Sequence, residues 1–202
     1  MSLAITPLDC TCGAEVTGID LKQPSSPGED EAIQDAFDQH AVLVFREQHL
    51  NDQQQIDFSK RFGQLERLIT KRAKNPAIAA LANVDQDGRV IPRDGSRALF
   101  LKGNTFWHTD SSFKRVPAKA SLLSARVVPG EGCQSPRTFR HAWRTGDLVL
   151  WDNRCVLHRG REWDPDQPRV MHRTTIAGEQ GGNEWSLGDT GAYTSVSEVR
   201  GA

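Results

Sequence analysis

The sequence predicts a mainly β protein with flanking helices and a double-stranded β-helix, or jelly-roll, core. Short apolar runs recur at close spacing, and turns rich in Gly, Asp and Pro separate them. Two stretches in the first third of the chain instead show helical spacing. With 202 residues, a mass of 22.4 kDa and 37% hydrophobic residues, the chain fits one domain with a modest core.

The two helices are expected early in the chain. Apolar residues spaced three and four apart predict a helix over residues 29–40, whose acidic start suits the helix dipole. Asn51 is a good N-cap, and Gln54 three residues later completes a capping box. This second helix is expected to run to about Phe62 and to end at Gly63.

The strands are expected from short apolar runs bounded by turn residues. Asp85-Gln86-Asp87-Gly88 and Gly146-Asp147 mark two of these turns. The expected strands cover residues 16–21, with a Gly-marked bend between Val16 and Ile19, and residues 41–45, 78–84, 89–91, 120–128, 148–151, 155–159 and 170–176. Residues 1–180 are expected to form one domain, and residues 181–202, rich in Gly, Ser and Thr, a loose C-terminal tail.

Composition argues against several kinds of partner. The formal net charge is -1, which gives no general attraction to nucleic acid or to an anionic membrane. No apolar run is long enough to cross a bilayer, and the N-terminus lacks the pattern of a secretory signal. The four cysteines form no CxxC pair, which indicates a cytoplasmic protein with reduced thiols, although Cys10 and Cys12 could pair on a metal.

The residues that point to chemistry begin with His108 and Asp110. On an extended segment, residues two apart point to the same face. His158 is the best candidate for a third ligand. Two His and one carboxylate leave three positions open on an octahedral ion, as suits a non-heme Fe(II) oxygenase. A His-x-Asp tripeptide alone is a weak signal, because it occurs by chance in many soluble proteins.

Two arginines on one expected strand indicate possible anion-binding sites. Arg169, Met171 and Arg173 would share one face of a strand, with His172 on the other. If that face points inward, each guanidinium needs an anion, and its planar fork suits a carboxylate or a sulfonate. The alternative is two exposed arginines on an edge strand.

Together these stretches resemble a known family, the Fe(II)- and 2-oxoglutarate-dependent dioxygenases related to taurine dioxygenase and dichlorophenoxyacetate dioxygenase. The resemblance extends from near the N-terminus to about Glu179. The amino-acid sequence of residues 111–113 and 158–160 resembles the aryloxyalkanoate branch more closely than the taurine branch. The matching blocks are residues 41–46, 107–113, 146–160 and 169–175.

The resemblance implies roles residue by residue. The three residues that match the iron ligands are His108, Asp110 and His158. Arg169 matches the arginine that holds the distal carboxylate of 2-oxoglutarate, and Arg173 the one that receives the acidic group of the substrate. Asn104 stands where the taurine branch has a pocket asparagine. Trp151 and Asn153 would support the strand that carries His158, or simply pack.

The resemblance also implies a reaction. A small organic acid, with an aryloxyalkanoate as the favoured class, is hydroxylated with O2, and the hydroxylated product breaks down to a phenol and an oxo acid. In the same reaction 2-oxoglutarate is converted to succinate and CO2. One alternative is the same chemistry on an alkyl sulfate or on a sulfonate such as taurine. Alternatives of another class are a non-catalytic jelly-roll binding protein and, less favoured because no separate general base is apparent, a hydrolytic zinc enzyme. No nucleic acid or membrane partner is expected, and homo-oligomerisation is left open.

One stretch departs from the family pattern. After the strand over residues 120–128, the family continues into a Gly-Gly-Asp-Thr motif, whose Thr contacts 2-oxoglutarate, and then into several tens of further residues. Here Cys133 and Gln134 lead almost directly to the block near Phe139, and Thr138 is no secure counterpart of that Thr. Either the sequence leaves out an unordered segment near residues 133–134, or the protein has a true deletion. The first is favoured, because a barrel that lacks strands exposes unpaired edges.

Overall fold

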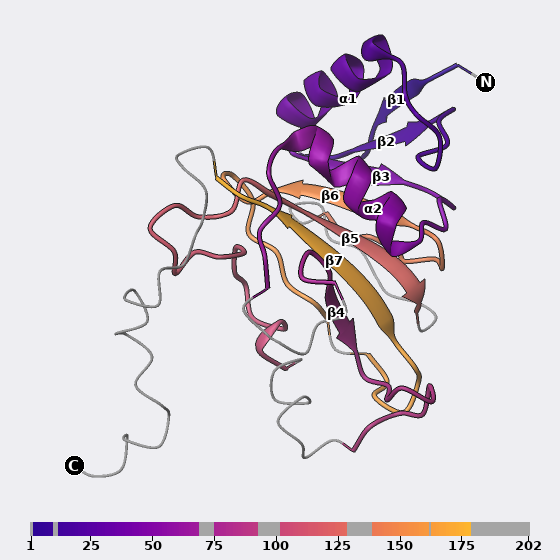
Figure 1. The fold of residues 1–202 in the computed structure, drawn as a ribbon, viewed down its shortest axis with the longest axis vertical. Helices are drawn as coiled ribbons and strands as arrows, with labels where there is room; N and C mark the ends of the chain where they lie inside the picture. Colours follow the sequence, from indigo (N-terminus) through magenta and orange to yellow (C-terminus); the bar gives the residue numbers. More distant parts are fainter. Residues whose placement is uncertain are drawn as a thin grey trace.

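A computed structural model describes residues 2–9, 12–68, 75–92, 102–128, 139–161 and 163–178 of the chain (Figure 1). Its elements are β1 (Ala4–Pro7), β2 (Ala14–Thr17), α1 (Pro27–His40), β3 (Val42–Phe45), α2 (Asp52–Ser59), the 3-10 helix η1 (Lys60–Phe62), β4 (Ala79–Ala82), β5 (Ala120–Val127), β6 (Leu148–Asp152) and β7 (Val170–Ile176).

The strands form one seven-stranded sheet in the order β1-β2-β3-β6-β5-β7-β4. Neighbouring strands are antiparallel except β2 and β3, which run parallel because α1 connects them as a crossover. β5 and β6 lie in the middle, and every residue of β6 is buried. The expected mainly β protein with flanking helices is confirmed.

Both faces of the central strands are covered. Along β3, Leu43 and Phe45 belong to the large core cluster with residues of α1 and α2, and Phe45 meets Phe58 of α2 edge to face with the ring centroids 5.4 Å apart. The alternate residue Val44 packs on the opposite face with Trp151 of β6. Figure 1 shows the two helices close together beside β2 and β3.

The helices begin where the sequence indicates. Asn51 and Gln54 form the expected capping box, with the Gln54 backbone N donating to the Asn51 side chain at 2.8 Å. Ser26 and Glu29 form a second capping box at the start of α1, which therefore begins two residues earlier than expected. After α2 the chain tightens into η1 and leaves the helix at Gly63, whose φ of +141° an L side chain rarely adopts.

Most expected strands are present with shifted ends. Val84 bridges to Val90 across the expected turn at residues 85–88. The first expected strand, over residues 16–21, ends at Thr17, and Gly18 makes the expected bend with a φ of +74°. β1, which pairs with β2, was not expected from the sequence.

The prediction of a strand over residues 155–159 is wrong. Directly after β6 the carbonyl of Asp152 accepts hydrogen bonds from the backbone N of Cys155 and Val156, which reverses the chain in a turn. Beyond that turn a single β-bridge remains, between His158 and His108. The expected tail over residues 181–202 lies outside the described residues. Within the described part of the chain, no helix has the length and apolar character required to cross a membrane.

Candidate metal centre

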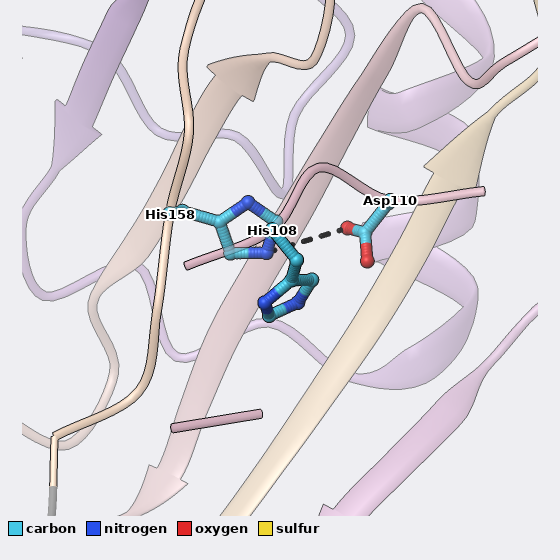
Figure 2. A group of neighbouring side chains, drawn as sticks. All are labelled: His108, Asp110 and His158. Atoms are coloured by element: carbon cyan, nitrogen blue, oxygen red, sulfur yellow. Dashed lines mark ion pairs between the residues drawn. The ribbon is translucent and has the colours of Figure 1, made fainter. Parts of the chain in front are cut away.

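His108, Asp110 and His158 come together on the side of the sheet away from α2. One nitrogen of each His and one oxygen of Asp110 all lie within 4.8 Å of one another. The β-bridge fixes the two segments, with His108 N donating to His158 O at 2.9 Å and His158 N to His108 O at 2.8 Å. Figure 2 shows the three side chains converging from these segments. The expected triad is therefore brought together.

The side chain of His108 is oriented by its own backbone. Nδ1 lies 2.7 Å from the carbonyl O of Phe106. Because a carbonyl oxygen only accepts, Nδ1 carries the proton and donates it. The lone pair is then on Nε2, which is the state in which histidine binds a metal through that nitrogen.

His158 is held in its neutral form. Burial lowers its pKa to about 4, assisted by His108 and Arg173 and opposed by the Asp110 carboxylate. Its Nε2 lies 3.7 Å from Asp110 Oδ2, the pair joined by the dashed line in Figure 2. With a neutral imidazole this contact is no ion pair at neutral pH, and the spacing suits two ligands of one ion.

Asp110 is buried and both of its oxygens are hydrogen-bonded. Ser121 Oγ donates to Oδ2 at 2.6 Å, and an amino group of Arg173 donates to Oδ1 at 2.5 Å. The two-nitrogen, one-carboxylate donor set with a preset His tautomer fits Fe(II) or another divalent first-row metal. Fixed orientation of the ligands is what such a site requires.

The two expected anion-binding arginines have different surroundings. The guanidinium of Arg169 lies 4.7 Å from the centre of the Trp163 ring, and burial lowers its pKa to about 10. Within the described residues no carboxylate pairs with it. Arg173 instead contacts Asp110, while its Nε is buried without a hydrogen-bond partner among the described residues. As expected, His172 points to the other face and contacts Asp52 of α2.

Asn104 lies beside the segment that carries His158. Its backbone O accepts a hydrogen bond from Gly160 N at 2.6 Å, and the residue is half-buried. The structure therefore places the Asn104 backbone next to the segment that carries His158, and its pocket role stays a prediction. Thr138, which the sequence does not support as a 2-oxoglutarate contact, lies outside the described residues.

Two further residues, Ser121 and Trp163, were not recognised as part of the site from the sequence. Asn153 was expected to support the strand that carries His158 or simply to pack, and it contacts another segment, the one that carries Asp110. Ser121 contacts Asp110, and Trp163 stacks on Arg169. A serine in the apolar run of β5 was a visible signal, because a buried hydroxyl needs a partner. Nothing in the sequence alone identified that partner.

The chain matches the family described as "Taurine catabolism dioxygenase TauD, TfdA family" over residues 4–137 and 133–175. These stretches include most of the chain and all three candidate metal ligands. The chain belongs to this family of dioxygenases, and it is an enzyme of the oxidoreductase class.

Relatives of known activity agree with this assignment. The (S)-phenoxypropionate/alpha-ketoglutarate-dioxygenase of Sphingobium herbicidovorans is 28% identical over 282 positions, covering 87% of this chain and 95% of the relative. The alpha-ketoglutarate-dependent sulfate ester dioxygenase of Pseudomonas putida is 32% identical over 133 residues, covering 65% of this chain and 40% of the relative.

A solved structure also has this fold. The crystal structure of AAD-2 in complex with Mn(II) and N-oxalylglycine superposes with a TM-score of 0.79 at 27% identity, covering 92% of this chain and 100% of that chain.

Proposed function

We propose that this protein is an Fe(II)- and 2-oxoglutarate-dependent dioxygenase that hydroxylates a small organic acid, an aryloxyalkanoate. The observation that carries the proposal is the convergence of His108, Asp110 and His158, with donor atoms within 4.8 Å of one another. This set leaves positions open on an octahedral ion for 2-oxoglutarate and O2. The Mn(II) and N-oxalylglycine in AAD-2 and the names of the relatives support it.

His108, Asp110 and His158 would hold the iron. Fe(II), when bound there, supplies the redox chemistry that couples decarboxylation of 2-oxoglutarate to succinate with hydroxylation of a C–H bond by O2. The chain itself supplies orientation and charge. The hydrogen bond from Nδ1 of His108 leaves Nε2 as its ligand atom, and the neutral form of His158 lets that imidazole bind a metal without losing a proton.

Arg169 binds the distal carboxylate of 2-oxoglutarate. A guanidinium that is largely withdrawn from water and has no acidic partner among the described residues is costly, and a bound carboxylate would offset that cost through two parallel hydrogen bonds. The Trp163 ring covers the guanidinium from one side. The lowered pKa of Arg169, about 10, still leaves it charged at neutral pH.

Arg173 receives the acidic group of the substrate. One amino group is occupied by Asp110, and the buried Nε remains without a partner among the described residues. An anion docked on this arginine would therefore lie next to a metal ligand, which places the adjacent carbon near the iron. Asn104, whose backbone contacts Gly160 next to the His158 segment, is proposed to contribute its side chain to the substrate pocket.

Apolar surface beside the metal ligands favours an aryl group on the substrate. Phe106 and Phe113 are 67% and 65% exposed, and Trp107 and Leu157 are also exposed. All four lie within three residues of a ligand in the chain. Exposed large apolar side chains close to the ligands in the chain offer surface that can bind an apolar group.

The products follow from hydroxylation at the carbon that bears the aryloxy oxygen. The new hydroxyl and the aryloxy group then share one carbon, and the bond from that carbon to the aryloxy oxygen breaks. The aryloxy oxygen keeps the electron pair and takes a proton to become a phenol, while the carbon becomes the carbonyl of an oxo acid.

The second candidate is the same chemistry on an alkyl sulfate or a sulfonate. The similarity to the sulfate ester dioxygenase of Pseudomonas putida favours this candidate, and an arginine such as Arg173 can bind a carboxylate, a sulfate or a sulfonate. Neither the site nor the relatives favour the non-catalytic binding protein.

The proposal includes the remaining expectations for the whole protein. The seven-stranded sheet is one layer of a jelly roll, and the bridge between His108 and His158 belongs to its second layer. Residues 1–180 form one dioxygenase domain that includes a further segment near residues 133–134. The protein works in the cytoplasm on small acids and O2, without nucleic acid or membrane partners, and homo-oligomerisation stays open.

Turnover with a substrate panel tests the proposal. Succinate is measured with Fe(II), 2-oxoglutarate and, in turn, aryloxyacetates, both enantiomers of an aryloxypropionate, a medium-chain alkyl sulfate and taurine. Release of a phenol with an aryloxy acid is the expected result. Turnover with the sulfur compounds alone would assign the enzyme to the second candidate, and no turnover with any compound, while the metal binds, would contradict both.

A further inference from the structure

We infer that Asn153 is a positioning residue of the metal centre, which holds Asp110 through Ser121 and through the backbone of the ligand segment. The inference rests on the proposed metal site. Asn153 contributes no atom to the ligand group itself, and its side chain sets the direction of the hydrogen bonds that orient the carboxylate.

The orientation of the Asn153 amide is fixed by its donors. Its Oδ1 accepts from Trp151 Nε1 at 2.9 Å and from Asp110 N at 3.2 Å. An indole N–H and a backbone N–H can only donate, so the amide oxygen must face them. The amide nitrogen, Nδ2, is therefore directed to the other side, where it lies 2.9 Å from Ser121 Oγ.

The amide in turn fixes the hydroxyl proton of Ser121. Because Nδ2 of Asn153 can only donate, Ser121 Oγ accepts that hydrogen bond, and its single proton is left for Asp110 Oδ2 at 2.6 Å. Oδ2 is also the oxygen that lies 3.7 Å from His158 Nε2. The hydrogen-bond chain thus ends on the carboxylate oxygen that faces another ligand.

Asn153 also holds the backbone next to the carboxylate. Its carbonyl O accepts from Thr109 Oγ1 at 2.8 Å, while its side chain accepts from Asp110 N. Residues 109 and 110 are therefore tied to Asn153 on both sides of the peptide bond that joins them. The register of the sheet makes this possible, because Ser121 of β5 pairs with Trp151 of β6 two residues before Asn153.

Burial makes these contacts costly to lose. Ser121 is fully buried, and Asp110, Trp151 and Asn153 are 5–6% exposed. Water cannot easily replace a lost partner at this depth, so a truncated side chain leaves its neighbours unsatisfied. Loss of a residue that orients a metal ligand typically weakens metal affinity by about 10- to 100-fold.

The test is a titration of the purified protein with Mn(II), followed by electron paramagnetic resonance, without substrate or turnover. The variants are Asn153→Ala, Ser121→Ala and the double variant, with Ser121→Thr to restore the hydroxyl. Gln48→Ala is the matched control: Gln48 is 8% exposed, and its amide accepts from Leu21 N and donates to two backbone carbonyls outside the ligand segments. Melting temperatures are recorded in parallel.

We expect Asn153→Ala and Ser121→Ala each to raise the Kd for Mn(II) by about 10- to 100-fold, with Ser121→Thr recovering part of the loss. The double variant should lose less than the product of the two single losses, because Asn153 acts partly through Ser121. Gln48→Ala should lower the melting temperature and leave the Kd within about twofold of wild type.

Wild-type Mn(II) affinity in a folded Asn153→Ala protein would overturn the inference, as would an equal loss in Gln48→Ala. If Asn153→Ala does not fold, Ser121→Ala decides, and a wild-type Kd there has the same meaning. A wild-type protein that binds no Mn(II) would instead overturn the proposed metal site, and the inference with it.

Discussion

Arg169 and Arg173 lie four residues apart, yet one guanidinium stacks on Trp163 and the other donates to Asp110. The stacked guanidinium is separate from the metal ligands and has no acid to pair with in the described part of the chain. The guanidinium of Arg173 instead contacts the candidate metal ligand Asp110 directly. This difference supports separate partners for the two arginines, 2-oxoglutarate for Arg169 and the substrate for Arg173.

Truncating each arginine should therefore give a different kinetic pattern. Arg169→Ala is expected to raise the KM for 2-oxoglutarate by about 10- to 100-fold, since a hydrogen bond to a charged group contributes about 1.5–3 kcal/mol. Arg173→Ala is expected to raise the KM for the aryloxy acid more than that for 2-oxoglutarate. Steady-state kinetics with each compound varied in turn measure both.

Arg89→Ala is the control for these variants, because the Arg89 side chain is 80% exposed and pairs only with the exposed Asp87 in the described residues. Its kinetics should match wild type. An equal rise of both KM values in Arg173→Ala would remove the substrate role from that residue.

The convergence of His108, Asp110 and His158 could be anticipated from the sequence, because the three residues lie in short motifs that resemble those of a known family. The orientation of Asp110 could not. Ser121 and Asn153 are 32 residues apart and meet only through the pairing of β5 with β6. Hydrogen bonds between residues so far apart depend on the register of the paired strands, which could not be predicted from the sequence.

At the scale of elements, the turn before β6 is held by the buried carboxylate of Asp147. The carboxylate accepts from Arg46 at 2.8 Å, from His141 and Arg144 N at 2.9 Å each, and from Glu47 N at 3.3 Å. Burial alone would raise the pKa of Asp147, but these hydrogen bonds together lower it to about 2.

This lowered pKa predicts a loss of stability in acid. Because the folded-state pKa lies below the ordinary value of 3.8, the ionised carboxylate stabilises the fold above that pH, and this contribution is lost as the pH falls toward 2. It amounts to about 2 kcal/mol. Urea unfolding of wild type and Asp147→Asn from about pH 6 to about pH 2.5 should show the stability gap between them narrowing. A gap that stays constant over this range would contradict the assignment.

The elements that could be predicted are those with local signals. The capping box of Asn51 and Gln54 and the buried run of β3 are determined by neighbouring residues. The prediction of a strand over residues 155–159 is wrong, because the backbone N of Cys155 and of Val156 donate to the Asp152 carbonyl and form a turn. The apolar residues of that segment gave no sign of the turn. β1 is short and mostly exposed, so it lacked the apolar pattern that predicts a strand.

At the scale of the whole molecule, the alignment with one relative is longer than this chain. The alignment with the Sphingobium herbicidovorans relative spans 282 positions, more than the 202 residues of this chain, so it leaves a long stretch of the relative without a counterpart. The two family matches meet at residues 133–137. Both observations support a further segment of the protein between residues 133 and 134.

The intact mass of the purified protein tests this directly. A segment at that point predicts a mass well above 22.4 kDa, because several tens of residues would be added. Peptide mapping should then place the extra residues between Cys133 and Gln134. A mass equal to 22.4 kDa would show a true deletion and leave the open sheet edges to be explained.

The most direct test of the central claim is anomalous diffraction from crystals of the protein soaked in Mn(II). One strong manganese peak is expected, bound by Nε2 of His108, Nε2 of His158 and the carboxylate of Asp110. Addition of N-oxalylglycine should place its distal carboxylate on Arg169. A peak elsewhere, or no peak at these three side chains, would contradict the assignment of this group as the iron site.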